Sequence, residues 1–285
     1  MMQLDNDQVD ALLKRLHFAN ARRVWPELVR RAEEEGWSYR DFFVLLVSEE
    51  IAHRKQTRLA RVTRRAKFPF LKTVEDFDFT FQSTLRMSML GSYLSPDFVT
   101  DGRCLILSGK PGRGKTHLAI AIAYRAILHG FDALFVTAAE LIETLSMAAR
   151  KGQLRDTLAR FVTPNVLVVD EVGYLAYGDD AANVLYHVVN ERHLKRKAMV
   201  FTTNKAIARW GDVLHDDDLA EAIVDRILER GRLLKLDGPS QRAPKSFDDP
   251  LQSQPARVSG IDRPEFPEPT GSSRGTRSAK PSRYW

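Results

Sequence analysis

One eight-residue motif constrains the fold of this 285-residue chain more than any other feature: Gly109-Lys110-Pro111-Gly112-Arg113-Gly114-Lys115-Thr116. It matches G-x-x-x-x-G-K-[ST], a loop that wraps phosphate groups between a strand and a helix. An apolar run at 104–107 precedes it and a helical pattern at 118–128 follows it. Backbone N–H groups at the start of such a helix hold anions. The alternative is a chance glycine turn, and the strand-loop-helix context favours a nucleotide site instead.

The positions of this loop have separate predicted roles. Gly112 and Gly114 lack the Cβ atoms that would block a phosphate. Lys115 is expected to reach the β- and γ-phosphates, and the Thr116 hydroxyl to ligate Mg²⁺. The expected cofactors are therefore ATP and Mg²⁺. The residues expected to contact the nucleotide are Gly109, Lys110, Pro111, Gly112, Arg113, Gly114, Lys115, Thr116 and His117.

Two acidic residues follow the apolar run 166–169, which predicts a buried parallel strand. In α/β sheets ligands bind beyond the carboxyl ends of the strands. Asp170 is expected there to hold Mg²⁺ through water, and Glu171 to orient and polarise the attacking water. Because phosphotransferases must exclude water, the second acid favours a hydrolase over a small-molecule kinase. The alternative is an acidic strand end that simply faces solvent.

Two further residues are candidates for the same reaction. Asn204 ends the run Phe201-Thr202-Thr203-Asn204, and its amide could orient the water or sense the γ-phosphate. Arg226 lies in a later helical segment and could supply the positive charge that phosphoryl transfer needs. It could equally form a surface ion pair with Asp225, and the sequence leaves both readings open.

Alternating strand and helix patterns predict an α/β fold with a parallel five-stranded sheet that helices cover on both faces. The predicted strands are 104–107, 133–136, 166–169, 199–202 and 233–236. The predicted helices are 115–129, 138–150, 180–195 and 216–230. Residues 71–102 are expected to form a connector. Its aromatic run, Phe77 to Phe81, either covers the adenine or belongs to the core.

The first part of the chain is expected to be helical. Apolar spacing predicts one helix over 4–34, ended by Gly36, and a second that starts after Ser38 and runs to about Lys67. Its last third is basic, and acidic partners at i±4 are missing. This face is either merely solvated or neutralised by a DNA backbone. The candidate DNA-binding residues are Arg54, Lys55, Arg58, Arg61, Arg64 and Arg65.

The distribution of charged and apolar residues allows predictions of the cellular compartment and of the domain boundaries. The net charge is +6, and basic and acidic residues are equal in number within 68–242, so the excess lies at the two ends. No apolar stretch has the length of a membrane span, and the acidic, polar start does not resemble a secretory signal. One cysteine, Cys104, excludes an internal disulfide. We expect a cytoplasmic protein with domains 1–67 and 68–242 and a disordered basic tail, 243–285.

With these motifs the chain resembles the IstB-type AAA+ ATPases, the helper proteins of transposons with a two-gene transposition module. The resemblance covers roughly residues 4–242. Beyond the general ATPase motifs, it rests on five shared pieces: Asp170-Glu171-Val172-Gly173-Tyr174-Leu175, Asn190-Glu191-Arg192, Thr203-Asn204 with Trp210-Gly211, Ala222-Ile223-Val224-Asp225-Arg226, and the basic helix that runs into Lys67-Phe68-Pro69 and Phe77-Asp78-Phe79.

This resemblance implies an ATPase that binds DNA and regulates transposition. Such proteins place a small helical domain before the AAA+ domain and assemble as homo-oligomers on DNA. ATP would then lie between neighbouring subunits, with Arg226 acting in trans, and the partner would be a DDE-type transposase. Arg242 is a further family-like arginine, although Gln241 stands where an aromatic residue is usual. The related DnaC-type helicase loaders, which bind single-stranded DNA, are the alternative, but few aromatic residues interleave with the basic run.

Overall fold

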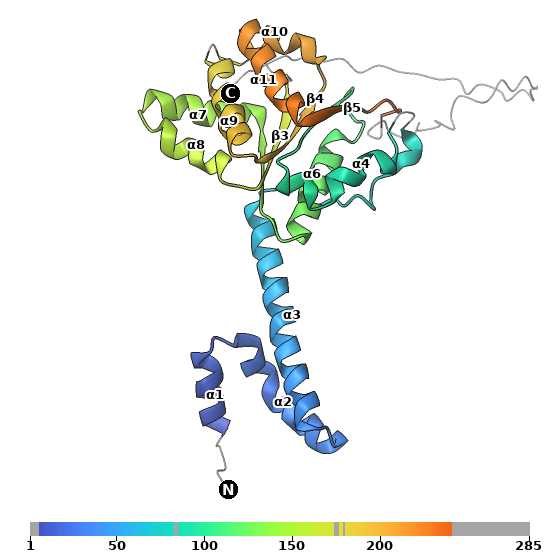
Figure 1. Ribbon diagram of the computed structural model, residues 1–285, viewed down its shortest axis with the longest axis vertical. Coiled ribbons are helices and arrows are strands. Elements are labelled where there is room, and N and C mark those ends of the chain that lie inside the picture. Colours follow the sequence, from blue (N-terminus) through green and yellow to red (C-terminus); the bar gives the residue numbers. More distant parts are fainter. Residues whose placement is uncertain (1–5, 83–84, 174–176, 179, 241–285) are drawn as a thin grey trace, which may run out of the picture. The chain divides into compact units, whose positions relative to one another are not determined.

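The computed structural model describes residues 6–82, 85–173, 177–178 and 180–240, and Figure 1 shows how its elements are arranged. The predictions for Arg242 and for the tail 243–285 lie outside the described residues. No helix within the described ranges combines the length and apolar character needed to cross a membrane.

The segment 4–34 contains two helices, so the prediction of one continuous helix was wrong. These are α1 (Asn6–Arg15) and α2 (Ala19–Glu35). His17 adopts a left-handed conformation with φ 57°, and the Phe18 N–H donates to the Leu13 carbonyl at 2.9 Å. This wrapped-back hydrogen bond is a common way for a helix to end. Residues other than glycine seldom adopt that conformation, and the apolar spacing continues across the break, so the sequence pattern did not reveal it.

The second predicted helix is confirmed as α3 (Tyr39–Arg65). Gly36 is left-handed with φ 68° and ends α2. Ser38 begins α3, because its hydroxyl accepts a hydrogen bond from the Asp41 N–H at 3.1 Å. A serine at this position satisfies one of the unpaired N–H groups of the first turn.

Glu50 of α3 joins this helix to the start of α2. Its side chain is only 3% exposed, and one carboxylate oxygen accepts from the N–H groups of Asn20 and Ala21, each at 2.9 Å. The other oxygen accepts from Arg54 at 2.7 Å. Burial favours a higher pKa for Glu50, but the hydrogen bonds outweigh it and lower the pKa below its usual value. The carboxylate therefore satisfies N-terminal donors of α2 that would otherwise be buried without partners.

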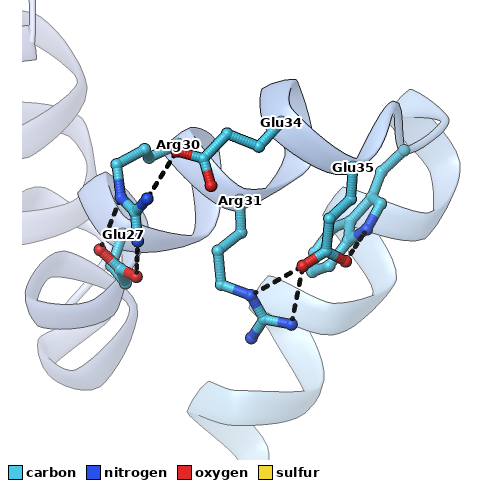
Figure 2. A network of polar contacts seen from close by, with 6 residues as sticks. Glu27, Arg30, Arg31, Glu34 and Glu35 are labelled. Atoms are coloured by element: carbon cyan, nitrogen blue, oxygen red, sulfur yellow. Dashed lines mark hydrogen bonds and ion pairs between the residues drawn. The ribbon is translucent and has the colours of Figure 1, made fainter.

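Arg30 and Arg31 on the surface of α2 are paired with nearby acids on the same helix. Figure 2 shows Arg30 between Glu27 and Glu34, with N–O distances of 2.5 and 2.6 Å, and Arg31 beside Glu35. All of these groups are exposed, so the pairs contribute little to stability. They do leave little unpaired positive charge on this part of α2.

Five parallel strands form one sheet in the order β2-β3-β4-β1-β5. The predicted strands are all confirmed, and most are one residue longer or shifted by one or two residues. Their bounds are β1 (Cys104–Ser108), β2 (Ala133–Thr137), β3 (Val166–Val172), β4 (Ala198–Thr203) and β5 (Gly231–Lys235). Because all five run in one direction, the carboxyl ends of β1, β3 and β4 meet at one edge.

Helices pack on both faces of this sheet, as predicted (Figure 1). Strand residues alternate, so that Ile106 faces one core and Leu107 the other. One face is covered by α4 (Met87–Leu94), α5 (Asp97–Thr100) and α6 (Lys115–Leu128). The other is covered by α7 (Ala138–Arg150), α8 (Leu154–Val162), α9 (Ala181–Leu194), α10 (Trp210–Leu214) and α11 (Asp217–Glu229). The short helices α4, α5, α8 and α10 were not predicted, since each is too short to show a clear helical period.

The end of α3 packs against the edge strand β2. The carbonyl of Ala66, a fully buried residue, accepts a hydrogen bond from the Phe135 N–H at 2.8 Å. Earlier in α3, the Arg58 guanidinium donates to the carbonyl of Gly130, a residue just before β2. The C-terminal end of α3 is therefore fixed to the sheet by main-chain as well as side-chain contacts.

Arg192 of α9 is fully buried and organises the start of β3 and β4. Its guanidinium donates to five main-chain carbonyls at 2.6–3.3 Å: those of Phe161, Val162, Pro164, Asn165 and Ala198. Burial lowers the pKa of Arg192 to about 9, which leaves the group charged at pH 7. All five contacts come from the two terminal nitrogens, Nη1 and Nη2, whereas Nε is buried without a partner among the described residues.

Candidate nucleotide-binding site

The glycine-rich loop connects β1 to α6 at the carboxyl edge of the sheet. Gly112 and Gly114 have φ values of 78° and 83°, a left-handed conformation that favours glycine. A Cβ atom at Gly114 would lie 2.5 Å from the Phe77 ring, so the loop can take this path only with glycine there. The loop thus combines a backbone shape and a packing contact that the motif requires.

The side chains that end the motif lie next to the predicted acid of β3. Lys115 donates to the Lys110 carbonyl at 3.0 Å, which holds the ammonium group over the loop. The Thr116 hydroxyl lies 3.0 and 3.1 Å from the two carboxylate oxygens of Asp170. Asp170 is only 5% exposed. A hydroxyl beside a carboxylate is a set of oxygen donors that suits Mg²⁺.

Glu171 follows Asp170 but faces solvent. The pairing of β3 with β4 is irregular between Val169 and Val172, and Glu171 has a left-handed φ of 61°. Such a β-bulge redirects a side chain, which here allows adjacent acids to occupy different environments. Strain of this kind in a residue other than glycine is most frequent at functional sites.

Thr202 of β4 connects the two acids. Its hydroxyl accepts from the Glu171 N–H at 2.9 Å and donates to a carboxylate oxygen of Asp170 at 2.5 Å. Thr202 is fully buried. The sequence identifies Thr202 only as part of the strand before Asn204, because a threonine inside an apolar strand gives no sign of its partners.

A cavity of about 280 Å³ opens between the loop and these strand ends. The predicted residues Lys115, Thr116, Glu171 and Asn204 all line it. The side-chain oxygen of Asn204 is buried without a hydrogen-bond partner among the described residues, as expected of a group that serves a ligand. The remaining lining residues are Phe70, Lys72, Pro111, Gly112, Arg113, Gly114, His117 and Thr202. A phosphate chain with Mg²⁺ fits this set of donors and acceptors.

The aromatic run of the connector contributes to the core rather than to the cavity wall. Phe77 is 5% exposed and packs edge-on against Phe79 and His117, with ring centroids 4.8 and 5.2 Å apart. Phe81 is exposed. The aromatic residue that lines the cavity is Phe70, which lies in the segment after α3.

Two further residues support the site and were not predicted. The Gln82 amide donates to the Arg113 carbonyl of the loop at 3.2 Å. The Tyr177 hydroxyl donates to the Glu171 carbonyl at 3.3 Å and accepts from the Gly173 N–H at 3.2 Å. Burial raises the pKa of Tyr177, so the phenol stays protonated and can donate. Neither contact has a sequence signal, because Gln82, Arg113 and Tyr177 all lie outside the regular helices and strands.

Arg226 lies apart from this cavity. It lines a second cavity on α9 and α11, which shares no lining residue with the first. Its guanidinium donates to the Asn190 side chain at 3.0 Å and to the Ala222 carbonyl, and it stacks over the Tyr186 ring with its central carbon 4.8 Å from the ring centroid. Among the described residues it forms no ion pair with Asp225, so the surface-pair alternative is not what the structure shows.

The basic run of α3 divides into two groups. Arg54 pairs with Glu50 and donates to the His17 carbonyl at 2.7 Å, so the expectation that this run lacks acidic partners at i±4 was wrong for Arg54. Glu50 lies just outside the run. Arg58 donates to Gly130. The side chains of Lys55, Arg61, Arg64 and Arg65 are exposed and have no hydrogen-bond or ion-pair partner in the described part of the chain.

Comparison with known proteins gives a family match over most of the chain. The family model for IstB-like ATP-binding proteins matches residues 11–248. The proposed ATP-binding protein of insertion sequence IS5376 from Geobacillus stearothermophilus is 32% identical over 236 residues, which cover 83% of this chain and 94% of the relative. That of insertion sequence IS21 from Pseudomonas aeruginosa is 33% identical over 235 residues, covering 82% and 88%.

Solved structures are more distant. AMPPCP-bound DnaA from Aquifex aeolicus superposes with a TM-score of 0.50 at 19% identity, covering 60% of this chain and 51% of that chain. The DnaC helicase loader gives a TM-score of 0.47 at 22% identity, covering 62% and 99%. At these identities the DnaA comparison supports the shared fold alone.

Proposed function

Because this chain belongs to the IstB-like ATP-binding protein family, we propose that it is a Mg²⁺-dependent ATPase that assembles on duplex DNA and recruits and activates a DDE-type transposase at target DNA. One observation carries the ATPase proposal. Lys115, Thr116, Glu171 and Asn204 converge on one cavity from three separate elements, and Asp170 is bonded to Thr116.

Each of these side chains has a role that follows from its position. Thr116 and Asp170 would hold Mg²⁺, which when bound neutralises charge on the phosphates. Lys115 binds the β- and γ-phosphates, and its present contact with the Lys110 carbonyl keeps it over the loop. The glycines of the loop present N–H groups to the same phosphates.

Glu171 and Asn204 act on the attacking water. Glu171 is the only one of the two strand-end acids that faces the open cavity, so it can accept a proton from water or polarise it. Asn204 presents an unpaired amide oxygen from β4. A neutral amide can align a water molecule without adding negative charge near the γ-phosphate.

Arg226 completes a neighbouring site rather than the site of its own chain. The phosphate-loop cavity does not include Arg226, yet phosphoryl transfer gains from an arginine that approaches the γ-phosphate. A homo-oligomer with ATP at subunit interfaces would supply it in trans. In the free chain the Asn190 side chain holds Arg226 over the Tyr186 ring, at the wall of the cavity on α9 and α11.

DNA binding is assigned to the helical segment 1–67 and ATP hydrolysis to 68–242. The exposed basic residues of α3 support the first assignment, because positive charge without acidic neighbours favours a polyanion. The role in transposition is supported by relatives that belong to insertion sequences.

The test is ATP turnover and sedimentation with long duplex DNA, with single-stranded DNA, and with neither. We expect ATP-dependent assembly and faster turnover on duplex DNA. Stimulation by single strands alone would indicate a helicase loader instead. A protein that binds ATP but responds to neither would refute DNA binding while leaving the nucleotide site intact.

A further inference from the structure

A third cavity, of about 550 Å³, lies where the end of α3 meets the start of β2. We propose that it binds phosphates of the DNA backbone and that Arg160 of α8 belongs to the DNA contact. The inference rests on the proposed DNA binding and adds a residue of the ATPase domain to it. Five of the lining residues are basic, namely Arg58, Arg61, Arg65, Lys67 and Arg160, and one is acidic, Asp132.

The single acid does not neutralise these cations. A carboxylate oxygen of Asp132 accepts from the Asn165 N–H at 2.8 Å, and the Asn165 side-chain oxygen accepts from the Asp132 N–H at 3.3 Å. Asp132 thus joins the loops before β2 and β3. Its role is accounted for by main-chain contacts, and it forms no ion pair with the basic residues in the described ranges.

Three of the five cations have no partner of their own. Within the described residues, the side chains of Arg61, Arg65 and Lys67 form neither an ion pair nor a hydrogen bond, and all three are exposed. Arg30 and Arg31 of α2 differ, because acids flank them (Figure 2). The dipole at the C-terminal end of α3 stabilises the positive charge of Arg65 in the last turn. It does not account for Arg160, which lies on α8.

Arg160 approaches the same cavity from the other side of the fold. It stacks over the Phe161 ring, with its central carbon 5.3 Å from the ring centroid, and its ion pair with Glu140 is long at 3.7 Å. The side chain is 44% exposed, so the pair is weak in water. A phosphate would therefore meet little competition for this guanidinium.

The geometry fits a nucleic-acid backbone better than a small anion. Arg58 to Arg65 spans about 10 Å along the helix axis. Phosphates of one DNA strand recur every 3.4 Å along the duplex, so about three of them face such a length. Like charges this close repel one another unless a polyanion neutralises them. Arg160 would add a contact from the ATPase domain and so link DNA binding to the body that hydrolyses ATP.

The test measures duplex binding by fluorescence anisotropy at several salt concentrations, using the full chain. Arg160→Gln should weaken binding several-fold and reduce the slope of log K against log salt by about one. The double variant Arg61→Gln/Arg65→Gln should reduce this slope by about two. Arg155→Gln is the matched control, because Arg155 is an exposed arginine of the same helix outside the cavity. Arg160→Lys should restore most of the slope.

Different failures are distinguishable. If the wild-type protein does not bind duplex DNA at low salt, the proposed function fails. If it binds but Arg160→Gln behaves like Arg155→Gln, the DNA contact is made by the helix alone and the cavity is refuted. If inorganic phosphate binds in a way that depends on Arg160, but Arg160 has no effect on DNA binding, the cavity is a site for free anions. That result would also refute the proposal. Nucleotide binding reports correct folding, since the two cavities share no residue.

Discussion

The hydroxyl of Thr202 donates a 2.5 Å hydrogen bond to the carboxylate of Asp170. The Thr202 hydroxyl oxygen also accepts a hydrogen bond from the Glu171 N–H at 2.9 Å. Its single proton is therefore used in the bond to Asp170. One buried threonine thus fixes the carboxylate of the first acid and the backbone of the second. A shift of either acid must break a hydrogen bond in a fully buried place, which is costly.

We expect Thr202→Val to slow hydrolysis more than it weakens ATP binding. Valine keeps the shape of the side chain but leaves the Glu171 N–H unpaired, so the water-directing acid loses its support. Turnover should fall about tenfold to a hundredfold, or about 1.4–2.8 kcal/mol in the transition state. Thr202→Ser should recover most of the activity. Turnover and nucleotide affinity, measured on the same protein, check the split, and normal turnover by Thr202→Val would contradict it.

Lys115→Ala and Glu171→Gln should fail in different ways. Without Lys115 the phosphates lose their cation, and we expect no measurable ATP binding. With Glu171→Gln we expect ATP binding to persist while turnover falls by roughly a hundredfold or more. That variant should stay on duplex DNA with ATP bound, as sedimentation would show. Hydrolysis at the normal rate by Glu171→Gln would remove this residue from the water-positioning role.

Arg226 can be tested by mixing two inactive variants. Arg226→Ala should lower turnover by about a thousandfold, the lower end of the range for such arginines. Lys115→Ala lacks a working site but keeps Arg226. A mixture of the two should regain activity on duplex DNA, because each can supply what the other lacks at one interface. If Arg226 acts within its own chain, the mixture stays as inactive as its parts.

Glu50 should make the N-terminal helices sensitive to acid. Hydrogen bonds hold its folded pKa below the ordinary 4.5, so the charged form is favoured in the folded state. The stabilisation is complete above about pH 4.5 and is lost as the pH falls through the folded value. Glu50→Gln should lower stability by roughly 1–3 kcal/mol at pH 7. Urea unfolding across this range should show the difference from wild type shrinking at low pH, and a constant difference would contradict it.

Arg192→Met should destabilise the fold strongly. Methionine fills part of the space but leaves five main-chain carbonyls without the donor that they share. We expect a loss of roughly 3 kcal/mol or more. Arg192→Lys should recover only part of it, since an ammonium has three donors and no planar fork. The urea midpoint measures both losses, and an unchanged midpoint in Arg192→Met would refute the role.

The parts of the fold that were predicted are those written in local patterns. Apolar runs of strand length and the helical spacing between them are visible along the chain, and the phosphate-loop motif fixes which strand ends matter. Asp170 and Glu171 could be chosen because they directly follow such a run. The sheet order and the pairing of β3 with β4 could not be read in the same way, because they depend on contacts between distant segments.

The residues that were missed act through those distant contacts. Thr202 and Gln82 are ordinary residues in sequence, and each becomes informative only when a partner in a distant segment is known. The partners of Tyr177, Glu171 and Gly173, are close in sequence, but no pattern indicates the contact. The break at His17 was hidden for another reason, because the apolar spacing continues through it. Glu50 was overlooked as a partner of Arg54 because it lies four residues before that arginine, outside the basic run.

The hydrogen bond from the Phe135 N–H to the Ala66 carbonyl limits where this chain can be truncated. β2 is an edge strand, and exposed edges invite pairing with other chains. A shortened protein that begins at residue 68 would keep every motif of the ATPase domain yet expose that amide and the apolar surface beneath Ala66. Dissection of the two functions is therefore better done by leaving the last turn of α3 in place, so that insolubility of an overly short fragment is not mistaken for a loss of activity.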